Sequence, residues 1–576
     1  MDLFLDRLSE PLDALMTILA GLGINLETLT TQSEMIGRFY TLAIRWLLPL
    51  MAAVILLRCL LTLLGEKREK TPWGYLQLPS GLRISITRWE NLIGRGRFAD
   101  IVINVPTLSR SHAVLTHRHD AWLLRDLGSK GGSEVNGTKV EGEAAIDYGD
   151  TISLAGLEMT LFPAGIDSPQ QRHEYDPDAF VSAERTANHT TLALILLFQF
   201  LGAIQIYLAR GAAAPALPLI FLSFFLLESL HYVIIRRYSR RNLVPELIGY
   251  FLCGLNLLIV ASSSPGTLLK QLAAILIGMI AYTVIIAVAR DLDRAHSLRY
   301  LFIVAGLLMM ILNLALGKSH FGARNWIDLG FISFQPMEFV KIAFVLAGTA
   351  TLDRLLTTRN MTAFVGFSGA SIITLALIND LGTALIFFGA FVMISFMHSG
   401  NIRTLFLFLS GAAFGGLAVV IFKPHIAARF ALWGKAWQFA NSSGYQQTRT
   451  MIAAASGGLL GVGGGRGYLV SVAAADTDLV FGMLCEEWGL LLALVAILMI
   501  VFLAFYAVVL TRGCRSSFYA IAACGAATIF ILQMALNVLG SVDLLPFTGV
   551  TIPFISNGGS SMIASWGLLA LIKAAE

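Results

Sequence analysis

The chain has 576 residues, of which 56% are hydrophobic and only 14% are charged, and its formal net charge is +4. A soluble domain carries about 25% charged residues, so most of this chain is predicted to face lipid. The same composition excludes disorder and collagen, and the small net charge gives no reason to expect a nucleic-acid partner. The five cysteines lie in or beside apolar segments without a C-x-x-C pair, and they indicate neither a zinc site nor a disulfide framework.

The N-terminal region, residues 1–71, is predicted to be a membrane anchor. Its apolar run at about 40–64 is long enough to span a bilayer, and a charged stop follows at 66–70. The shorter stretch 12–24 carries Asp13 and is predicted to be an interfacial helix. No cleavable signal peptide is recognised here, so we expect the segment to be retained.

Residues 72–163 differ from the rest of the chain in composition and in apolar pattern. Charges become frequent, and short alternating apolar runs are separated by Gly, Asn and Asp. This pattern predicts a small all-β sandwich. A polar, proline-bearing linker is predicted over 164–189.

From residue 190 onward the chain is predicted to be a polytopic α-helical membrane domain. Twelve apolar runs lie near 190–209, 214–236, 244–263, 268–290, 298–317, 336–354, 363–379, 381–399, 403–423, 479–511, 516–540 and 549–573. With the run before the sandwich, this gives about 13 transmembrane helices and an inserted β-sandwich.

Basic clusters predict the orientation of the chain. Lys and Arg gather at 67–70, 236–241 and 290–294, and such loops stay cytoplasmic. The sandwich and the C-terminus are therefore expected in the cytoplasm of a bacterial cell, and the N-terminus outside. The lightly charged segment 423–478 is expected to pack over the extracellular face.

Four spaced motifs mark the loops of the predicted sandwich: G-R-G at 94–96, S-R-S-H at 109–112, W-L-L-R-D at 122–126 and N-G at 136–137. In this order they resemble the forkhead-associated (FHA) domain. The resemblance implies recognition of a phosphothreonine peptide.

The resemblance also assigns the phosphate contacts. Arg95 matches the family arginine that contacts phosphate, and Ser109 matches the serine that hydrogen-bonds it. A guanidinium and a hydroxyl donor suit a dianionic phosphate, and Arg110 adds a second cation.

Three further residues of the sandwich are expected to be structural. His112 is expected to hold its loop by hydrogen bonding, as in the family, and Asn136-Gly137 to form a hairpin turn.

The chain departs from the family at Lys130-Gly131, where an asparagine normally binds the peptide backbone. Either Lys130 supplies a different phosphate contact or peptide binding is weakened; the alternative is a scaffold that binds a protein surface without phosphate.

Polar clusters interrupt the apolar helices of the membrane domain, and ionisable groups at membrane depth are functional candidates. Glu338 and Lys341 lie one helical turn apart and are expected to form a structural ion pair. Asp380 opens an apolar run, where a helix cap and a functional role are equally supported.

Asp478 has a different setting, because it lies where a glycine-rich external loop meets a helix. A carboxylate at the rim of an outward-facing cavity can act as a general base. Arg324, Arg449 and Arg466 are on the same predicted side and suit an anion such as pyrophosphate. The glycine-rich run 457–467 lacks the spacing and the lysine of a nucleotide-binding loop.

Six motifs then follow in order, namely G-A-R-x-W-I-x-L-G, Q-P-x-E-x-x-K, D-L-G-T, G-G-L-x-G-x-G, T-D-x-x-F and P-F-x-S-x-G-G-S-S. They resemble the SEDS family of bacterial cell-wall proteins, the group of RodA, FtsW and SpoVE. The best-matched core is 318–576, and residues 190–317 hold extra helices. Lys318, Glu338, Lys341 and Asp380 are further candidate substrate-binding residues on this resemblance.

The resemblance implies a peptidoglycan glycosyltransferase that polymerises lipid II at the outer face of the cytoplasmic membrane. The family's catalytic aspartate matches Asp478. Arginines or a divalent cation, Mg²⁺ or Mn²⁺, are expected to stabilise the departing pyrophosphate. Expected partners are a class B penicillin-binding protein, which is a transpeptidase, and a phosphothreonine protein made by a Ser/Thr kinase.

Several positions depart from the family pattern. Asp476 replaces the usual histidine, Asn557 replaces a common tyrosine, and five helices instead of three precede the G-A-R motif. The extra helix pair belongs to no part of the resemblance. Two alternative functions are a lipid II flippase, and a phosphosignalling scaffold with an inactive membrane domain.

The linker 164–189 is long and polar, so rigid coupling between the two domains is not expected. The sandwich is therefore expected to recruit a partner or to localise the enzyme, with little effect on turnover.

Overall fold

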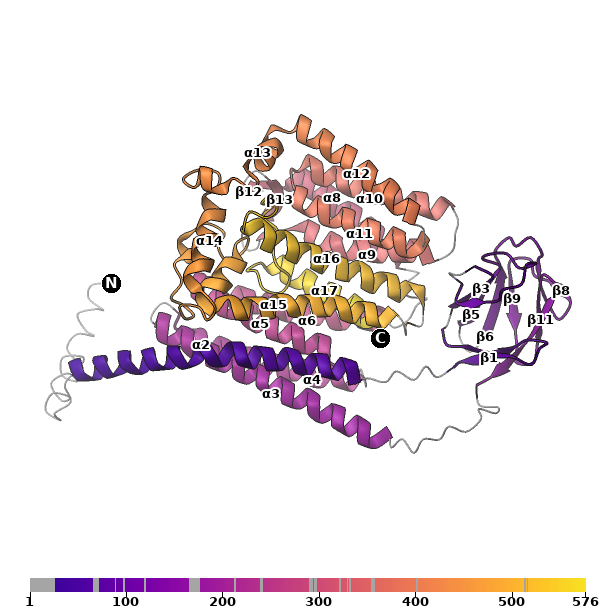
Figure 1. Ribbon diagram of the computed structural model, residues 1–576, viewed down its shortest axis with the longest axis horizontal. Helices are drawn as coiled ribbons and strands as arrows, with labels where there is room; N and C mark the ends of the chain where they lie inside the picture. Colours follow the sequence, from indigo (N-terminus) through magenta and orange to yellow (C-terminus); the bar gives the residue numbers. More distant parts are fainter. Residues whose placement is uncertain are drawn as a thin grey trace.

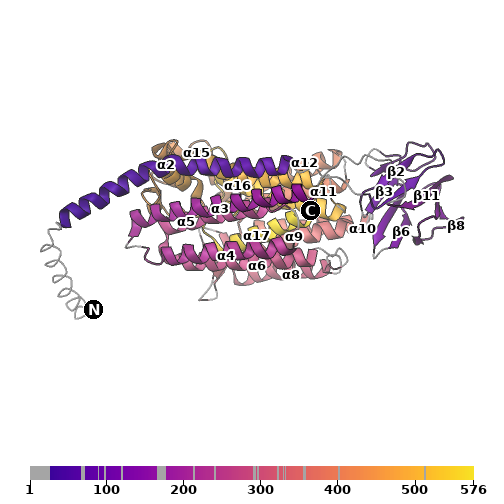
Figure 2. The ribbon, with the colours of Figure 1, turned by 90° about the horizontal axis from the view of Figure 1, so that it is seen from below.

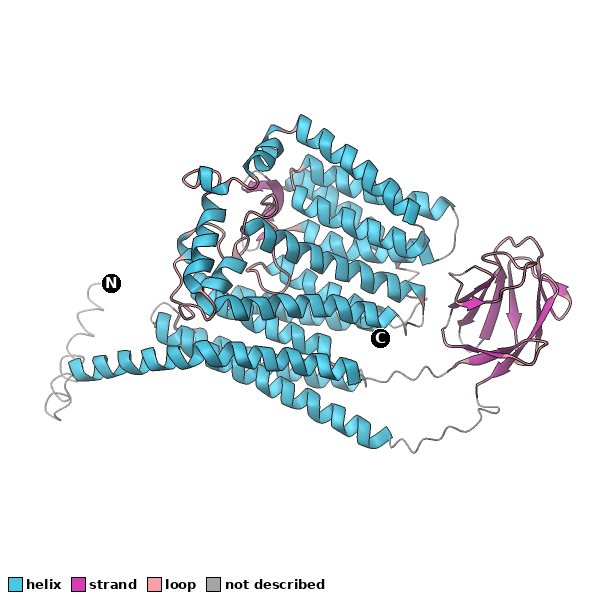
Figure 3. Cartoon of the chain, viewed as in Figure 1, coloured by secondary structure: helices cyan, strands magenta, loops and turns pink. Residues whose placement is uncertain are grey.

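The computed structural model describes residues 26–576 except 66–71, 89, 97–98, 119–120, 165–176, 212–213, 239–241, 290–293, 295–297, 321–322, 329, 331–332, 354–357, 400–401, 512–513 and 515. A helical bundle and a β-sandwich make up the chain (Figure 3). The predicted interfacial helix at 12–24 lies outside the described residues.

The long apolar helices lie side by side in the bundle (Figure 1). They are α2 (Leu26–Gly65), α3 (Pro177–Arg210), α4 (Leu217–Tyr238), α5 (Val244–Ser263), α6 (Leu268–Ala289), α8 (Arg299–Leu316), α9 (Pro336–Asp353), α10 (Thr358–Leu377), α11 (Leu381–Ser399), α12 (Ile402–Phe422), α15 (Val480–Thr511), α16 (Ser517–Ser541) and α17 (Gly559–Ala574). Each predicted apolar run thus coincides with a helix. Among the described residues, eight helices are long and apolar enough to cross a membrane. The polytopic class is confirmed, and the count of 13 spans stays a prediction.

Two helix boundaries differ from the predicted ones. The last apolar run was expected from residue 549, but α17 begins at Gly559, because Gly549 and Phe554 have φ values of 67° and 62°. α3 begins at Pro177, so part of the predicted linker 164–189 is helical.

The extra helices cover one side of the bundle. α3 and α4 contact α5, and α2 contacts α3 and α15. As a result α5 is buried along its whole length except its last residue, although its apolar sequence would also suit a lipid-facing helix. The helix pair that the family pattern left unassigned therefore packs against the core.

One end of the bundle carries short elements between the long helices. They are the strands β12 (Lys318–His320), β13 (Ala323–Asp328) and β14 (Ser333–Phe334), the helices α13 (Pro424–Leu432) and α14 (Tyr445–Gly457), and the 3-10 helices η2 (Pro265–Thr267), η3 (Ala436–Phe439) and η4 (Leu469–Ser471). The segment 423–478 thus folds onto the helix ends, and its expected position on the extracellular face stays a prediction. The sandwich lies beyond the opposite ends of the helices (Figure 2).

The sandwich has a six-stranded sheet in the order β2-β1-β11-β10-β7-β8 and a five-stranded sheet in the order β4-β3-β5-β6-β9. Its strands are β1 (Gly74–Gln77), β2 (Arg83–Ile86), β3 (Glu90–Gly94), β4 (Ile101–Val102), β5 (Ala113–Arg118), β6 (Ala121–Asp126), β7 (Ser133–Val135), β8 (Thr138–Lys139), β9 (Glu143–Ile146), β10 (Thr151–Leu154) and β11 (Leu157–Pro163). Alternate residues of the strands point inward around the fully buried Trp122 and form their own apolar core.

Candidate functional site

Asp478 sits on a tight loop just before α15. The carbonyl oxygen of Ala474, a residue with φ of 60°, accepts hydrogen bonds from the amides of Thr477 and Asp478 at 3.3 and 3.0 Å. From α16, Asn537 Nδ2 donates to the carbonyl oxygens of Asp478 and Val550 at 3.0 and 2.6 Å. The backbone of Asp478 is therefore fixed, while its side chain stays half-buried.

The surroundings of Asp478 raise the pKa of its carboxyl group to about 6. Burial is the largest cause, and the negative charges of Asp380 and Asp476 act in the same direction. A hydrogen bond from the Thr477 side chain and the positive charge of Arg429 oppose this rise. A carboxyl with such a pKa is poised to accept a proton near neutral pH.

Asp476, the other carboxylate of this loop, has a structural environment. Its Oδ2 accepts hydrogen bonds from Ser263 Oγ, Ser264 Oγ and Asn557 Nδ2 at 2.8, 2.9 and 2.9 Å. The amide of Asn557 also donates to the Asp476 carbonyl oxygen at 2.8 Å. Asp476 and Asn557, both departures from the family pattern, therefore pair with each other and join α5 to the turn before α17.

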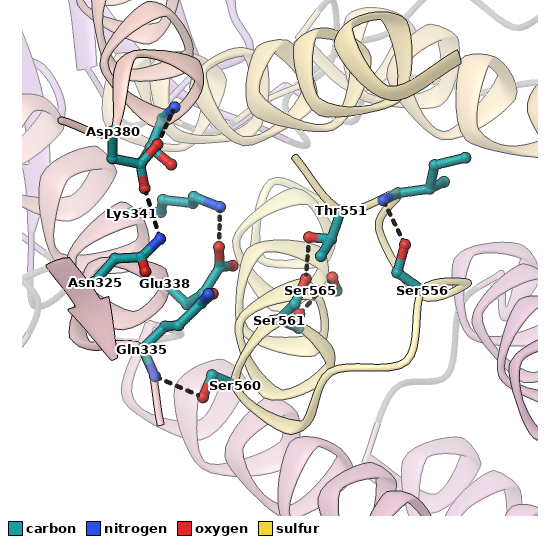
Figure 4. A network of polar contacts seen from close by, with 12 residues as sticks. Asn325, Gln335, Glu338, Lys341, Asp380, Thr551, Ser556, Ser560, Ser561 and Ser565 are labelled. Atoms are coloured by element: carbon teal, nitrogen blue, oxygen red, sulfur yellow. Dashed lines mark hydrogen bonds and ion pairs between the residues drawn. The ribbon is translucent and has the colours of Figure 1, made fainter. Parts of the chain in front are cut away.

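Asp380 is a helix cap that also lies close enough to influence Asp478. Its Oδ1 accepts a hydrogen bond from the amide of Thr383 at 3.0 Å, in the first turn of α11. Its Oδ2 accepts one from Asn325 Nδ2 of β13 at 3.2 Å (Figure 4). The cap is thus present, and the charge of Asp380 also acts on the Asp478 carboxyl.

Glu338 and Lys341 form the expected ion pair, with 2.6 Å between Oε1 and Nζ. Their side chains are only 9% and 1% exposed. Figure 4 shows the pair between Asn325 and the first turn of α17, near where the amide of Gln335 donates to Ser560 Oγ at 3.1 Å. Each charge satisfies the other, which is how ionisable groups are tolerated at this depth.

The four basic residues predicted to bind the substrate differ in exposure and in contacts. Arg324 and Arg466 are exposed, Arg449 stacks over the ring of Tyr445 at 5.0 Å, and Lys318 Nζ lies 3.2 Å from Asp328 Oδ2. None of the described contacts joins these four cations to Asp478.

Sequence reasoning missed two residues at this site, Arg429 and Asn537. Arg429 is exposed on α13, outside every motif, and its charge acts on the Asp478 carboxyl. Asn537 is a buried amide within the apolar helix α16. An amide in an otherwise apolar run was the available signal for Asn537, while Arg429 had none.

The glycine-rich loop is held by two neighbouring glutamates of α15. Glu486 accepts hydrogen bonds from the amides of Tyr468 and Leu469 at 2.9 and 2.8 Å. Glu487 accepts one from the amide of Gly465 at 3.0 Å. Close packing requires the glycines here, since a Cβ at position 457 would lie 2.0 Å from the Cys485 carbonyl oxygen.

At one end of the sandwich, three phosphate-site candidates come together. The amide of Arg95 donates to the Ser109 carbonyl oxygen at 3.1 Å, and the amide of Lys130 donates to Ser109 Oγ at 3.1 Å. Because its Oγ accepts from Lys130, the hydroxyl proton of Ser109 is available to a ligand. The side chains of Arg95, Arg110 and Lys130 are exposed, so all three cations are accessible to a ligand.

His112 supports this end of the sandwich from inside. It is fully buried, its Nδ1 accepts from the amide of Ser109 at 3.2 Å, and its Nε2 lies 3.0 Å from the Gly132 carbonyl oxygen. Its expected structural role is consistent with these contacts. Asn136 and Gly137 have φ of 50° and 78°, as a two-residue hairpin turn requires.

The structure gives a physical reason for Gly131. A Cβ at this position would lie 2.3 Å from the Cβ of Ala155, which is in the turn between β10 and β11 with φ of 52°. The asparagine of the family pattern would therefore clash in this chain. The side chain of Ala155 therefore explains why this chain has glycine instead of asparagine at position 131.

The fold and these sites define a polytopic membrane protein with an inserted FHA domain, and residues 91–155 match the FHA domain model. Residues 255–576 match the family model of FtsW, RodA and SpoVE, described as cell cycle protein. Because this match covers more than half of the chain, the protein belongs to the FtsW/RodA/SpoVE family. The match starts within α5, earlier than the core of 318–576 that the motifs indicated.

The chain is similar to several individual proteins. The peptidoglycan glycosyltransferase RodA of Mycobacterium tuberculosis is 29% identical over 329 residues, covering 53% of this chain and 69% of the relative. The probable peptidoglycan glycosyltransferase FtsW of Wigglesworthia glossinidia brevipalpis is 30% identical over 47% of this chain and 74% of its own. A chain of a peptidoglycan synthase complex that coordinates polymerization and crosslinking is 25% identical, with a TM-score of 0.49, over 57% of this chain and 95% of its own.

Proposed function

We propose that this protein is a peptidoglycan glycosyltransferase that polymerises lipid II, with Asp478 as its general base. Membership of the FtsW/RodA/SpoVE family and the names of the relatives support the activity. The observation that carries the residue assignment is the contrast within one loop: Asp476 is engaged by three donors, whereas Asp478 is half-buried with a raised pKa.

In the proposed reaction, the Asp478 carboxylate takes the proton from the 4-hydroxyl group of the acceptor sugar. That oxygen attacks the anomeric carbon of the lipid-linked donor, and the bond from this carbon to the polyprenyl pyrophosphate breaks. The proton ends on Asp478 and the electron pair on the leaving pyrophosphate. No nucleotide is needed, since the pyrophosphate linkage supplies the free energy.

Cations on the outer elements would stabilise the leaving group. Arg324, Arg449 and Arg466 remain candidates, and Arg429 joins them because its charge already acts on Asp478. Among the described residues, no group of three or more His, Cys, Asp or Glu side chains is arranged to hold a metal ion. No step of the proposed reaction depends on a divalent cation.

The sandwich is proposed to bind a phosphothreonine peptide through Arg95, Ser109, Arg110 and Lys130. The Ser109 hydroxyl, which accepts from the Lys130 amide, and the exposed side chains of Arg95, Arg110 and Lys130 support this role. The basic clusters support a cytoplasmic sandwich, on the side of the membrane where phosphothreonine is made, and an Asp478 loop on the outer face. A class B penicillin-binding protein is the proposed transpeptidase partner.

The test is polymerisation of lipid II by the purified protein, with and without such a transpeptidase. Glycan strands are the expected product. Transfer of lipid II across vesicle membranes without polymer would favour the flippase instead. The position of Asp478 in the loop just before α15 supports the enzyme over the flippase, because a base for polymerisation is needed at the end of the bundle.

A further inference from the structure

Three consecutive serines, Ser262, Ser263 and Ser264, lie at the end of α5 that is nearest to the Asp478 loop, and no sequence motif includes them. The backbone holds them in place. The amide of Ser264 donates to the Val260 carbonyl oxygen at 2.8 Å, and the Ser264 carbonyl oxygen accepts from the amide of Thr267 in η2 at 2.9 Å. The three hydroxyl groups are therefore presented from a fixed turn at the end of a buried helix.

Two of these hydroxyls bind the same atom of the catalytic loop. Ser263 Oγ and Ser264 Oγ donate to Asp476 Oδ2 at 2.8 and 2.9 Å, and Asn557 Nδ2 is the third donor at 2.9 Å. Asp476 is two residues before Asp478, so the position of its side chain constrains the backbone that carries the proposed base.

The next two residues of the loop are held through their carbonyl oxygens. That of Thr477 accepts from Ser556 Oγ at 2.7 Å, and that of Asp478 accepts from Asn537 Nδ2 at 3.0 Å. These two bonds come from the turn before α17 and from α16. The side chain of Asp476 is the point at which α5 joins this set of contacts.

The same helix also holds the turn before α17. Asn256 Nδ2 donates to the carbonyl oxygens of Ile555 and Ser556, both at 2.9 Å. Asn256 and Ser263 are seven positions apart, so they lie on one face of α5. From α6, Gln271 Nε2 donates to Asn256 Oδ1 at 2.9 Å and fixes the orientation of that amide. One face of α5 therefore binds both the catalytic loop and the turn that lies against it.

The third serine reaches the glycine-rich loop through α15. Ser262 Oγ donates to Glu487 Oε1. Glu487 Oε2 accepts from the amide of Gly465 at 3.0 Å, and the Glu487 carbonyl oxygen accepts from the amide of Gly463 at 3.0 Å. The end of α5 thus sets the relative position of the two loops at this site.

The Asp478 carboxylate has little room to move without changing its surroundings. A Cβ added at Gly549 would lie 3.1 Å from Asp478 Oδ2, so the carboxylate lies directly beside the backbone of that segment. A general base must reach the proton it removes within hydrogen-bond distance. A misplacement of about 1 Å can reduce a rate about 10²-fold, so the contacts that place this loop matter for the reaction.

We propose that Ser263 and Ser264 are positioning residues of the transferase, which hold the Asp478 loop in its working position through the carboxylate of Asp476. They act through Asp476 and not on the reacting atoms. Ser262 holds the glycine-rich loop in register with the same helix end. The inference rests on the proposed function of Asp478 and adds the residues that place it.

The test measures lipid II polymerisation by the full-length protein in lipid nanodiscs. Ser263→Ala combined with Ser264→Ala is expected to lower kcat by about 10-fold or more and to change KM by less than about 2-fold. Ser263→Thr with Ser264→Thr keeps both hydroxyls and should retain the rate. Ser541→Ala is the matched control, because Ser541 is a buried serine at the end of α16 whose hydroxyl donates within its own helix, to the Val538 carbonyl oxygen at 2.9 Å.

A double-mutant cycle with Asp476→Ala shows whether the serines act through Asp476. Removing both hydroxyls in the Asp476→Ala background should change kcat by less than about 2-fold further, because residues that act as one unit are not additive. Effects that multiply independently would overturn the proposal, as would a wild-type kcat in the serine double variant. Ser264→Ala alone keeps the Ser263 donor and carries the same cycle if the double variant does not fold.

A separate readout distinguishes this proposal from the proposed function. If the wild-type protein makes no polymer, the assigned activity fails, and the cycle is measured by hydrogen–deuterium exchange over residues 472–482. Faster exchange in the serine variant, with no further increase in the Asp476→Ala background, supports the positioning role. Wild-type exchange in the serine variant overturns it.

Discussion

Asp476 and Asp478 are two residues apart in one loop, yet their surroundings differ. Three side chains donate to the Asp476 carboxylate, while Asp478 is half-buried beside the charge of Asp380. The three donors on Oδ2 give Asp476 a structural role, because they join it to the end of α5 and to the turn before α17. At the scale of single residues, this contrast is what separates a structural aspartate from a candidate base.

Asp478→Asn is expected to reduce lipid II polymerisation by about 10²–10⁴-fold, because the amide keeps the shape but cannot accept the proton. Burial raises the pKa of this carboxyl, so the charge destabilises the folded state and its removal should leave stability at neutral pH equal or higher. Polymerisation and thermal unfolding of the purified variant test both points. Normal polymerisation by Asp478→Asn together with its loss in Asp476→Asn would move the base to Asp476.

The pH profile follows from the pKa of about 6 at Asp478. The base works in its deprotonated form, so the polymerisation rate should be constant above about pH 7 and fall roughly tenfold per pH unit well below pH 6. The stability effect has the opposite sign: the contribution of this group is greatest at low pH and is lost as the pH rises from 3.8 towards 6. Initial rates and unfolding midpoints across pH 4.5–8 measure the two curves. A rate that stays flat down to pH 4.5 would contradict the assignment.

At the scale of elements, the loops at one end of the sandwich bring together residues that are far apart in sequence. The backbone amides of Arg95 and Lys130 both donate to Ser109, which holds three candidate phosphate-binding residues in one group of loops. The same crowding places Gly131 against Ala155. Binding and packing are therefore linked in this one group of loops.

Arg95→Ala is expected to lower the affinity for a phosphothreonine peptide by at least about tenfold, since a charge-assisted hydrogen bond is worth about 1.5–3 kcal/mol. Arg83→Ala is the control, because Arg83 lies on the edge strand β2 and stacks over Phe162. Calorimetry on the full-length protein measures both. Equal affinity of the wild type for phosphorylated and unphosphorylated peptide would favour the phosphate-independent scaffold.

Gly131→Asn is expected to destabilise the sandwich by about 1–3 kcal/mol, because its Cβ would overlap Ala155. Ala155→Gly should relieve the clash, and it also suits the left-handed backbone at that position. The double variant should therefore recover stability and acquire the family asparagine, with a gain in peptide affinity. Hydrogen–deuterium exchange over residues 74–163 at increasing urea concentration compares the variants, and an unaffected single variant would contradict the clash.

At the scale of the whole molecule, the proposed base and the sandwich lie at opposite ends of the helical bundle (Figure 2). A membrane-spanning helix of about 20 residues crosses some 30 Å, so no direct contact links the two sites. Any communication between them has to pass through the helices, and both α2 and α3 extend from the sandwich side to the glycine-rich loop.

The predicted orientation can be tested by cysteine labelling of intact cells. The five native cysteines are all buried, so they provide a low background. A cysteine at exposed Ser443, in the turn before α14, should react with an impermeant thiol reagent. A cysteine at exposed Lys139 in the sandwich should stay protected until the cells are opened. Labelling of the sandwich in intact cells would reverse the assigned orientation.

The membrane class, the β-sandwich and the position of nearly every long helix could be predicted from the sequence. The motifs also identified both families. Apolar runs and alternating strands are local patterns, and the motif at Asp478 carries its identity in neighbouring residues. The prediction was wrong at the start of the run 549–573. Its apolar composition is typical of a helix, but the backbone turns at Phe554, where φ is 62°.

Three features could be read only from the folded structure: which aspartate is engaged, why position 131 is a glycine, and where the extra helices pack. Each depends on residues far away in sequence: Ser263 and Asn557 for Asp476, Ala155 for Gly131. α2 lies against a loop more than four hundred residues further along the chain, where Thr41 packs on Gly463. No periodicity or motif encodes such a contact, because it is specified by the complementarity of two surfaces that exist only once the helices have packed.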